Sequence, residues 1–220
     1  MDHQLSLLGG QYTFALGVVQ RGIYGEQTKM IKNLVGVVAI QGDYDKHIIA
    51  VRECGAEARE IRTAEDLDGV DRVIIPGGES TTVSMLMRRF GLAGALTARV
   101  QAGMPIWGTC MGMILMAREV ESRPEQFSLR FLDITVRRNA FGAQVNSFED
   151  EVTVSGLDQP SLAVFIRAPV VTQLGPEVQV ISEYKGQVVA VREGNRLGTS
   201  FHPELTSDRR LHHWFLSFAA

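Results

Sequence analysis

The stretch Pro105-Ile-Trp-Gly-Thr-Cys-Met-Gly-Met-Ile-Leu-Met-Ala-Arg-Glu119 places a short apolar strand, a glycine-bounded turn and an apolar helix in direct succession. We predict the strand over 105–107 and the helix over 111–119. The turn between them is a G-x-nucleophile-x-G elbow with Cys110 in the nucleophile position. Flanking glycines relieve clashes in this tight turn, and the helix N-terminus favours the thiolate. The alternative is a buried cysteine in a glycine turn, which the strand before and the helix after make less favourable.

The same order of strand, loop and helix continues toward the N-terminus. Leu34–Ile40 is a continuous apolar run rich in β-branched residues, which is typical of a strand buried on both faces. An amphipathic helix follows over 45–54, with Gly55 as its C-cap. We predict further strands over 58–61 and 72–75 and further helices over 80–90 and 91–102. This order indicates right-handed βαβ units that form a parallel sheet with helices on both faces.

The second half of the chain changes to short strands separated by turns. Lys185-Gly186 and Gly194-Asn195 are good hairpin turns, so this half is expected to be mostly antiparallel. A final helix is predicted over 208–218. The predicted strands are 131–136, 151–154, 163–166, 178–182, 188–191 and 197–201.

A thiol needs a base to act as a nucleophile at neutral pH, and His202 is the histidine best placed to serve. It ends the predicted strand 197–201, at the edge where a parallel sheet presents its functional groups. Glu204 follows two residues later, so both side chains can point the same way along an extended segment. A carboxylate there can orient the imidazole. The alternative is a capping pair that starts the final helix.

A glycine-rich loop, Pro76-Gly-Gly-Glu-Ser-Thr81, follows the strand 72–75 and precedes a helix. Its glycines allow a backbone N–H to face a ligand oxygen, as an oxyanion hole requires. The alternative is a plain glycine turn in which Ser80 or Thr81 caps the helix. A phosphate-loop interpretation is weak because the Gly-Lys-Ser/Thr ending is lacking.

The composition is that of an ordinary globular protein, with 45% apolar residues, 21% charged residues and a net charge of -3 over 220 residues. Scattered basic residues argue against a nucleic acid or a membrane as partner, and no apolar run of about eighteen residues predicts a membrane span. The two cysteines, Cys54 and Cys110, form neither a disulfide framework nor a CxxC metal pair, so we expect a cytoplasmic protein without a metal site. Residues 1–29 are interpreted as a disordered or non-native N-terminal extension, and 30–220 as the functional domain.

Taken together, the glycine-rich loop, the cysteine elbow and the His-Pro-Glu segment resemble the class I (triad) glutamine amidotransferases. Within that superfamily the chain is similar to the family of glutaminase subunits of pyridoxal 5'-phosphate synthase, and the similar segments span nearly all of 34–220 in order. These segments are Gly36–Gly42, Glu53–Ala56, Pro76–Thr82, Arg138-Asn-Ala-Phe-Gly142, Ser147-Phe-Glu149, Phe165-Ile-Arg-Ala-Pro169 and Ser200–Thr206.

The resemblance implies an α/β, three-layer, flavodoxin-like fold whose central, mostly parallel sheet carries an antiparallel extension. It implies that Cys110 attacks the amide carbon of glutamine, that His202 shuttles the proton and that Glu204 orients His202. Gly78 and the backbone N–H of Met111 would form the oxyanion hole. Met111 departs from the family, which often has a smaller residue at this position.

The resemblance also implies a glutamine site and a protein partner. The positions that match the family's glutamine-binding residues are Gly78, Glu79, Ser80, Arg138, Ile166 and Arg167. An arginine suits the substrate carboxylate because its planar fork pairs with two oxygens. The partner would be a synthase subunit with a (β/α)8 barrel that receives the ammonia and activates the glutaminase on docking. Pyridoxal phosphate would be the product of the assembly, so no cofactor is expected in this chain.

Three other functions remain open on the residues alone. Another cysteine amidase, or a γ-glutamyl hydrolase on the same scaffold, would share the elbow and the histidine but lack the GGEST and RNxFG segments. A silent binding subunit would be expected to lack Cys110, His202 or Glu204, and all are present. A chaperone or peptidase with an elbow cysteine would leave the His-Pro-Glu segment unexplained.

Overall fold

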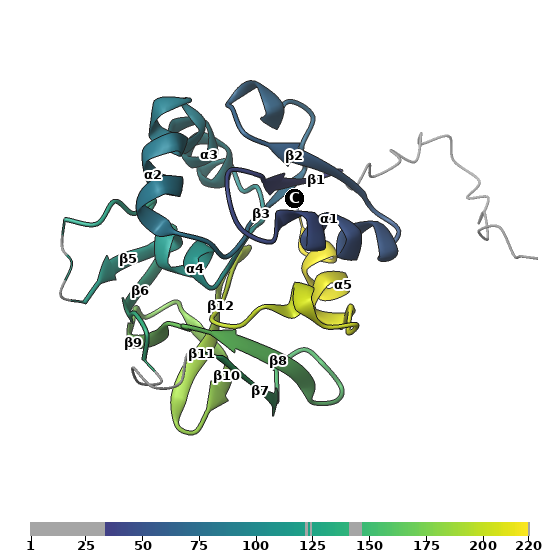
Figure 1. The fold of residues 1–220 in the computed structure, drawn as a ribbon, viewed down its shortest axis with the longest axis vertical. Helices are drawn as coiled ribbons and strands as arrows, with labels where there is room; N and C mark the ends of the chain where they lie inside the picture. The colour runs from purple at the N-terminus through teal and green to yellow at the C-terminus, as the bar shows by residue number, and fades with distance from the viewer. Residues whose placement is uncertain (1–33, 122, 124, 141–146, 220) are drawn as a thin grey trace, which may run out of the picture. The chain divides into compact units, whose positions relative to one another are not determined.

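The structure, a computed structural model, describes residues 34–121, 123, 125–140 and 147–219 (Figure 1). These residues all fall in the second of the two units, 1–31 and 32–220, into which the chain divides. The predicted boundary between an extension 1–29 and a domain 30–220 lies outside the described residues and stays a prediction.

Four strands of the N-terminal half and one distant strand form the parallel part of the main sheet. They are β1 (Leu34–Val38), β2 (Glu57–Ile61), β3 (Arg72–Ile75), β4 (Ile106–Thr109) and β12 (Arg196–Thr199). Their order is β2-β1-β3-β4-β12, and each neighbouring pair is parallel. Every residue of β3 and β4 is buried, as the continuous apolar runs predict for strands covered on both faces.

The sheet continues through an antiparallel extension. Its strands are β11 (Gln187–Glu193), β9 (Val170–Leu174), β6 (Leu132–Arg137) and β5 (Ala117–Val120), with β10 (Gln179–Tyr184) paired to β11. Only the pairing of β5 with β6 is parallel in this part. A separate antiparallel hairpin joins β7 (Ser147–Val152) to β8 (Ser161–Ile166).

Helices cover both faces of the parallel strands and complete three layers. The helices are α1 (Tyr44–Glu53), α2 (Ser80–Arg89), α3 (Leu92–Gln101), α4 (Met111–Met116) and α5 (Arg210–Leu216), with 3₁₀ turns η1 (Glu65–Leu67) and η2 (Pro203–Leu205). Figure 1 shows α2, α3 and α4 on one side of the sheet and α1 and α5 on the other. Val73 and Ile75 pack into the first core and Ile74 into the second, as alternation along a strand requires. The predicted three-layer α/β fold with an antiparallel extension is confirmed.

The extension differs from the sequence-based expectation at two places. The helix predicted over 111–119 ends at Met116, and residues 117–120 form β5 instead. The hydroxyl of Ser128 donates to the carbonyls of Leu115 and Ala117, and the Leu129 N–H donates to Leu115 O at 2.7 Å, so the last carbonyls of the helix are used by another segment. Strand β9 was not predicted, because Val170-Val-Thr-Gln-Leu174 does not alternate between apolar and polar residues.

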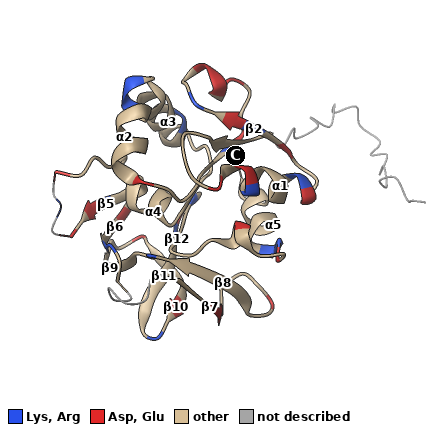
Figure 2. Ribbon diagram, in the orientation of Figure 1, with Lys and Arg blue, Asp and Glu red and all other residues tan. Residues whose placement is uncertain are grey.

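Charges of both signs are spread over the described surface. In Figure 2, basic and acidic segments lie near one another on the helices and loops around the sheet, so no face of a single sign is visible there among the described residues. None of the helices in the described ranges has the length and apolar content that a bilayer crossing requires.

Candidate active site

The site lies at the carboxyl ends of the parallel strands, where the strand order reverses around β1. Asp43 follows β1, Gly78 follows β3, Cys110 follows β4 and His202 follows β12. In open α/β sheets this edge is the place where ligands bind. The topology therefore collects residues from four segments that are far apart in the sequence.

Cys110 occupies the strained turn that the elbow predicts. Its φ of 50° and ψ of -106° lie outside the regions that side-chain-bearing residues favour, and its N–H donates to Thr199 O at 2.7 Å. A Cβ on Gly108 would lie 2.4 Å from the Gly112 carbonyl carbon, and one on Gly112 would lie 2.0 Å from Ile75 O. Both flanking positions thus require glycine, and the elbow conformation is confirmed. Residue Cys110 is only 9% exposed, but it lines a pocket.

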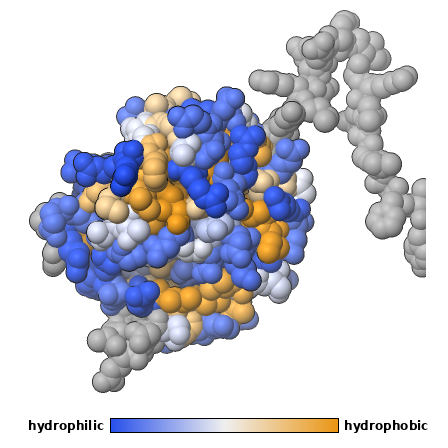
Figure 3. Space-filling model, turned by 45° about the horizontal axis from the view of Figure 1, so that its top comes forward, coloured by the Kyte–Doolittle hydropathy of each residue, from blue (hydrophilic) through white to orange (hydrophobic). Residues whose placement is uncertain are grey.

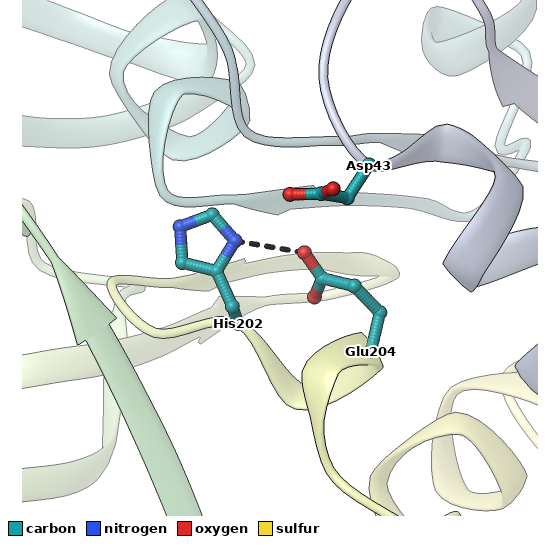
Figure 4. Close-up of side chains that lie close together, drawn as sticks. All are labelled: Asp43, His202 and Glu204. Carbon is teal, nitrogen blue, oxygen red and sulfur yellow. Dashed lines mark hydrogen bonds and ion pairs between the residues drawn. The ribbon is translucent and has the colours of Figure 1, made fainter. Parts of the chain in front are cut away.

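His202 and Glu204 form a buried pair (Figure 4). Nδ1 of His202 lies 2.7 Å from Oε1 of Glu204, and the two residues are 5% and 3% exposed. We predicted an extended segment from His202 to Glu204. This prediction is wrong, because Pro203–Leu205 forms the 3₁₀ turn η2 instead. The turn still brings the carboxylate onto the ring. Glu204 does not cap the final helix, which begins at Arg210.

The electrostatics of the pair favour an ionised relay. Burial alone would lower the pKa of His202, but hydrogen bonds and charge from Cys110 and Glu204 outweigh burial and raise that pKa to about 10. Burial would raise the pKa of Glu204, but His47 and His202 hold it well below its usual range. His202 is therefore protonated at neutral pH when Cys110 is a thiolate, with Glu204 as its counter-charge.

A second carboxylate, Asp43, approaches the pair from the loop before α1 (Figure 4). One ligand atom from each of Asp43, His202 and Glu204 lies within 4.8 Å of the others, which is the spacing a metal ion would need. However, Nδ1 of His202 is already hydrogen-bonded to Glu204. As an imidazolium, His202 offsets the charge of one of the two carboxylates. Sequence reasoning missed Asp43, and its only signal was its place after the Gln41-Gly42 turn at the end of β1.

A pocket of about 230 Å³ opens over the sulfur. It contains most of the predicted site residues, but Glu204 lies behind His202 and Ser80 lies beneath the surface at 1% exposure. The residues that line the pocket are Gly42, Asp43, Gly77, Gly78, Glu79, Cys110, Met111, Ile114, Arg138, Asn139, Ile166, Arg167 and His202.

Glu79, rather than Ser80 or Thr81, caps α2. Its carboxylate accepts the N–H groups of Thr81 at 3.0 Å and Thr82 at 2.7 Å. Those backbone hydrogen bonds, from Thr82 first and then Thr81, lower the pKa of Glu79 to about 2. The alternative that made Ser80 or Thr81 the cap is wrong, and the capping carboxylate faces the pocket as a fixed negative charge.

The far wall of the pocket is built by two loops that follow β6 and β8. They carry Arg138 and Arg167, and the Ala140 N–H joins them by donating to Ala168 O at 3.1 Å. The carbonyl of Ile166 lies 3.6 Å from the Cys110 sulfur. Residues 141 and 142, which complete the predicted RNxFG segment, lie outside the described residues.

The pocket thus combines a strained thiol, a histidine–carboxylate relay and a rim with charges of both signs. A nucleophile with such a relay performs acyl transfer at a carbonyl carbon. The two arginines can bind a carboxylate, and Asp43 and Glu79 can balance an ammonium group. A small zwitterion with a reactive carbonyl fits this chemistry.

Comparisons with known proteins agree with the geometry. The family model described as "SNO glutamine amidotransferase family" matches residues 37–219. "Pyridoxal 5'-phosphate synthase subunit PdxT" of Mycolicibacterium vanbaalenii is 52% identical over 187 residues, which cover 83% of this chain and 96% of that protein. The protein of the same name from Acidothermus cellulolyticus is 52% identical over 193 residues, covering 84% and 93%.

Solved structures give the same picture. A "Crystal structure of glutamine amidotransferase" superposes with a TM-score of 0.81 at 46% identity and covers 84% of this chain and 97% of that one. The structure of PurLQS from Thermotoga maritima has a TM-score of 0.63 at 16% identity, with 86% and 99% covered. The second likeness shows the fold alone.

Proposed function

The chain belongs to the SNO glutamine amidotransferase family, and from that membership we propose that it is the glutaminase subunit of a pyridoxal 5'-phosphate synthase. In this role it hydrolyses L-glutamine to L-glutamate and ammonia, and the ammonia passes to the synthase subunit for vitamin B6 biosynthesis. The observation that carries the proposal is the joining of Cys110, at a strained elbow, with the buried His202–Glu204 pair at one pocket.

The first half of the reaction forms a thioester. The Cys110 thiolate attacks the side-chain amide carbon of glutamine, and the carbonyl oxygen becomes an oxyanion. Gly78 and Met111 line the pocket, and their backbone N–H groups are the proposed donors to that oxyanion. His202 gives its proton to the amide nitrogen, the C–N bond breaks and ammonia leaves, with the γ-glutamyl group on sulfur.

The second half releases glutamate. His202, now neutral, takes a proton from water, and the hydroxide attacks the thioester carbon. The C–S bond breaks, so Cys110 returns as a thiolate and His202 as an imidazolium. Glu204 remains ionised throughout and fixes the ring through Nδ1.

Recognition of glutamine is proposed for the pocket rim. Arg138 and Arg167 suit the α-carboxylate, and Gly78, Glu79 and Ile166 lie at the same pocket. Ser80 does not line the pocket, so any part it has in glutamine binding is through the support of the loop. Its hydroxyl is buried without a hydrogen-bond partner among the described atoms.

The proposed partner is the synthase subunit, with a (β/α)8 barrel, and the proposed compartment is the cytoplasm. Pyridoxal phosphate is the product of the assembly, and no cofactor or metal is proposed for this chain. Exposed apolar side chains are available for contact with a protein, including Met85 at 58% and Phe90 at 48% exposure. Figure 3 shows hydrophobic residues gathered in patches on the face drawn.

Ammonia release from glutamine, measured with and without the synthase subunit, tests the proposal. We expect release from the assembled wild-type protein, none from Cys110→Ala and near-normal release from Cys54→Ala, since Cys54 lies at the end of α1. A glutamine-like diazoketone should label Cys110 alone. Hydrolysis of γ-glutamyl peptides in preference to free glutamine, or activity in Cys110→Ala, would contradict the assignment.

A further inference from the structure

A pair of buried histidines lies directly behind the relay. His47 of α1 is 0% exposed and His212 of α5 is 1% exposed, and His47 Nδ1 lies 3.1 Å from His212 Nε2. The Trp107 ring stands edge-on to both, with ring centroids 5.7 Å from His47 and 5.0 Å from His212. Buried polar rings cost free energy unless their nitrogens are satisfied, so the contacts of these rings need an explanation.

The second ring nitrogen of His47, Nε2, faces the carboxylate of Glu204. This nitrogen lies 3.2 Å from Glu204 Oε2 and 3.3 Å from the hydroxyl oxygen of Thr109. Glu204 uses its other oxygen for His202, so the two carboxylate oxygens face two different histidines. The contact with Oε2 meets the distance of an ion pair but not the geometry of an aligned hydrogen bond. The Nε2 group of His47 therefore stabilises the negative charge of Glu204 electrostatically rather than through an aligned hydrogen bond.

The protonation pattern of the two rings follows from their neighbours. Burial, followed by the proximity of His47, holds the pKa of His212 well below its usual range, so His212 is neutral. A bare Nε2 lone pair on His47 would face the negative carboxylate, which is unfavourable. Nε2 of His47 therefore carries a hydrogen. With the hydrogen of His47 on Nε2, its Nδ1 can accept a hydrogen bond from His212 Nε2–H, and this contact fixes that tautomer.

We propose that His47 is a positioning residue for the glutaminase reaction: its Nε2–H holds Glu204 ionised and oriented for His202, and His212 holds the His47 ring. The inference rests on the proposed function. The pKa of Glu204 supports it, because burial raises that pKa and the proximity of His47 is the largest influence that lowers it. The relay would then extend from the pocket to α5.

Kinetics of paired variants, assayed as ammonia release in complex with the synthase subunit, test the proposal. His47→Leu removes the donor, whereas the amide of His47→Gln can place an N–H near the position of Nε2. We expect His47→Leu to lower kcat by about tenfold to a hundredfold with little change in KM, and His47→Gln to recover most of it. The matched control is His213→Leu, on the exposed side of α5, which should behave as wild type.

The pH profile separates positioning from structural support. The titratable groups around Glu204 are His202 on its own segment, His47 and Asp43 from α1 and its preceding loop, and His212 behind His47. In His47→Leu the carboxylate loses the Nε2–H that faces its Oε2 atom, so its ionised form is less stabilised and the acidic limb of the kcat profile should move to higher pH. A loss of activity that left this limb in place would reduce His47 to a packing residue.

Two further results test the role of His47 separately from the pH profile. If wild type hydrolyses glutamine and a folded His47→Leu keeps full kcat, the inference is wrong while the proposed function stands; if wild type does not hydrolyse glutamine, the function itself fails. Should His47→Leu not fold, NMR of the wild-type chain with ¹⁵N-histidine gives the answer. Hydrogen on Nε2 of His47 supports the inference, and a bare Nε2 overturns it.

Discussion

Replacement of Gly77 by alanine offers a direct test of how tightly the base is held. A Cβ on Gly77 would lie 2.4 Å from Cε1 of His202, whereas ordinary contact begins at 3.4 Å. The backbone of Gly77 is not in the left-handed region, so alanine itself is compatible with it and the effect is purely steric. The ring must therefore withdraw by about 1 Å, a displacement that can cost roughly a hundredfold in rate.

Ammonia release by the complex and thermal unfolding of the variant would be measured together. We expect kcat to fall by about a hundredfold while the free energy of unfolding falls by about 1–3 kcal/mol, as for other overpacked sites. Gly94→Ala is the matched control, since Gly94 is exposed on α3 and a Cβ there meets nothing within 4 Å. The control should keep full activity and gain about 0.5–1 kcal/mol from helix propensity. Wild-type kcat in Gly77→Ala would show that the loop does not set the position of the ring.

Three further predictions concern the relay, the cap and the oxyanion loop. His202→Ala should reduce kcat by several powers of ten, and Glu204→Ala should reduce it by less, because the carboxylate only orients and supports the base. A steady-state kcat that is lower for Glu204→Ala than for His202→Ala would contradict this. The folded-state pKa of Glu79 is about 2, below its ordinary value of 4.5. The ionised carboxylate therefore stabilises the fold above pH 4.5, and this stabilisation is lost as the pH falls toward 2. In denaturant unfolding, Glu79→Gln should lose less free energy of unfolding over this pH window than wild type does. Glutaminase activity should rise when the synthase subunit is titrated in, because the Gly77-Gly78 peptide can turn an oxyanion donor into the site on docking. Gly78→Val should abolish this rise with little change in melting temperature. Full activity in the isolated chain would exclude such a switch.

Elements with local stop signals were predictable from the sequence. Strand β3 was predicted with its observed bounds, Arg72–Ile75, because Pro76-Gly77-Gly78 ends it sharply. Residues 117–120 were not, since their apolar pattern also continues the preceding helix, and only the pairing with β6 makes them a strand. Strand β9 similarly depends on its neighbours β6 and β11, which no local pattern reveals.

The residues of the site that were predicted also carry a local signal in the sequence, and those that were missed do not. Cys110 is marked by two glycines next to it in the chain, and His202 and Glu204 by a proline between them. His47 falls within the helix predicted over 45–54, and no local pattern marks it because its partners are distant: it contacts Thr109 across 62 residues and His212 across 165. Packing of α1 against α5, rather than any motif, brings these groups behind the relay.

The parallel pairing of β4 with β12 also determines when the chain becomes active as it refolds. Trp107 and Thr199 are hydrogen-bonded across 92 residues of intervening sequence. Closing so long a loop loses chain entropy before the contacts can compensate, so pairings of this kind form slowly. In a refolding chain, β4 and α4 will therefore form before β12 brings the base to the thiol. Recovery of glutamine hydrolysis should lag behind recovery of the far-ultraviolet circular dichroism signal.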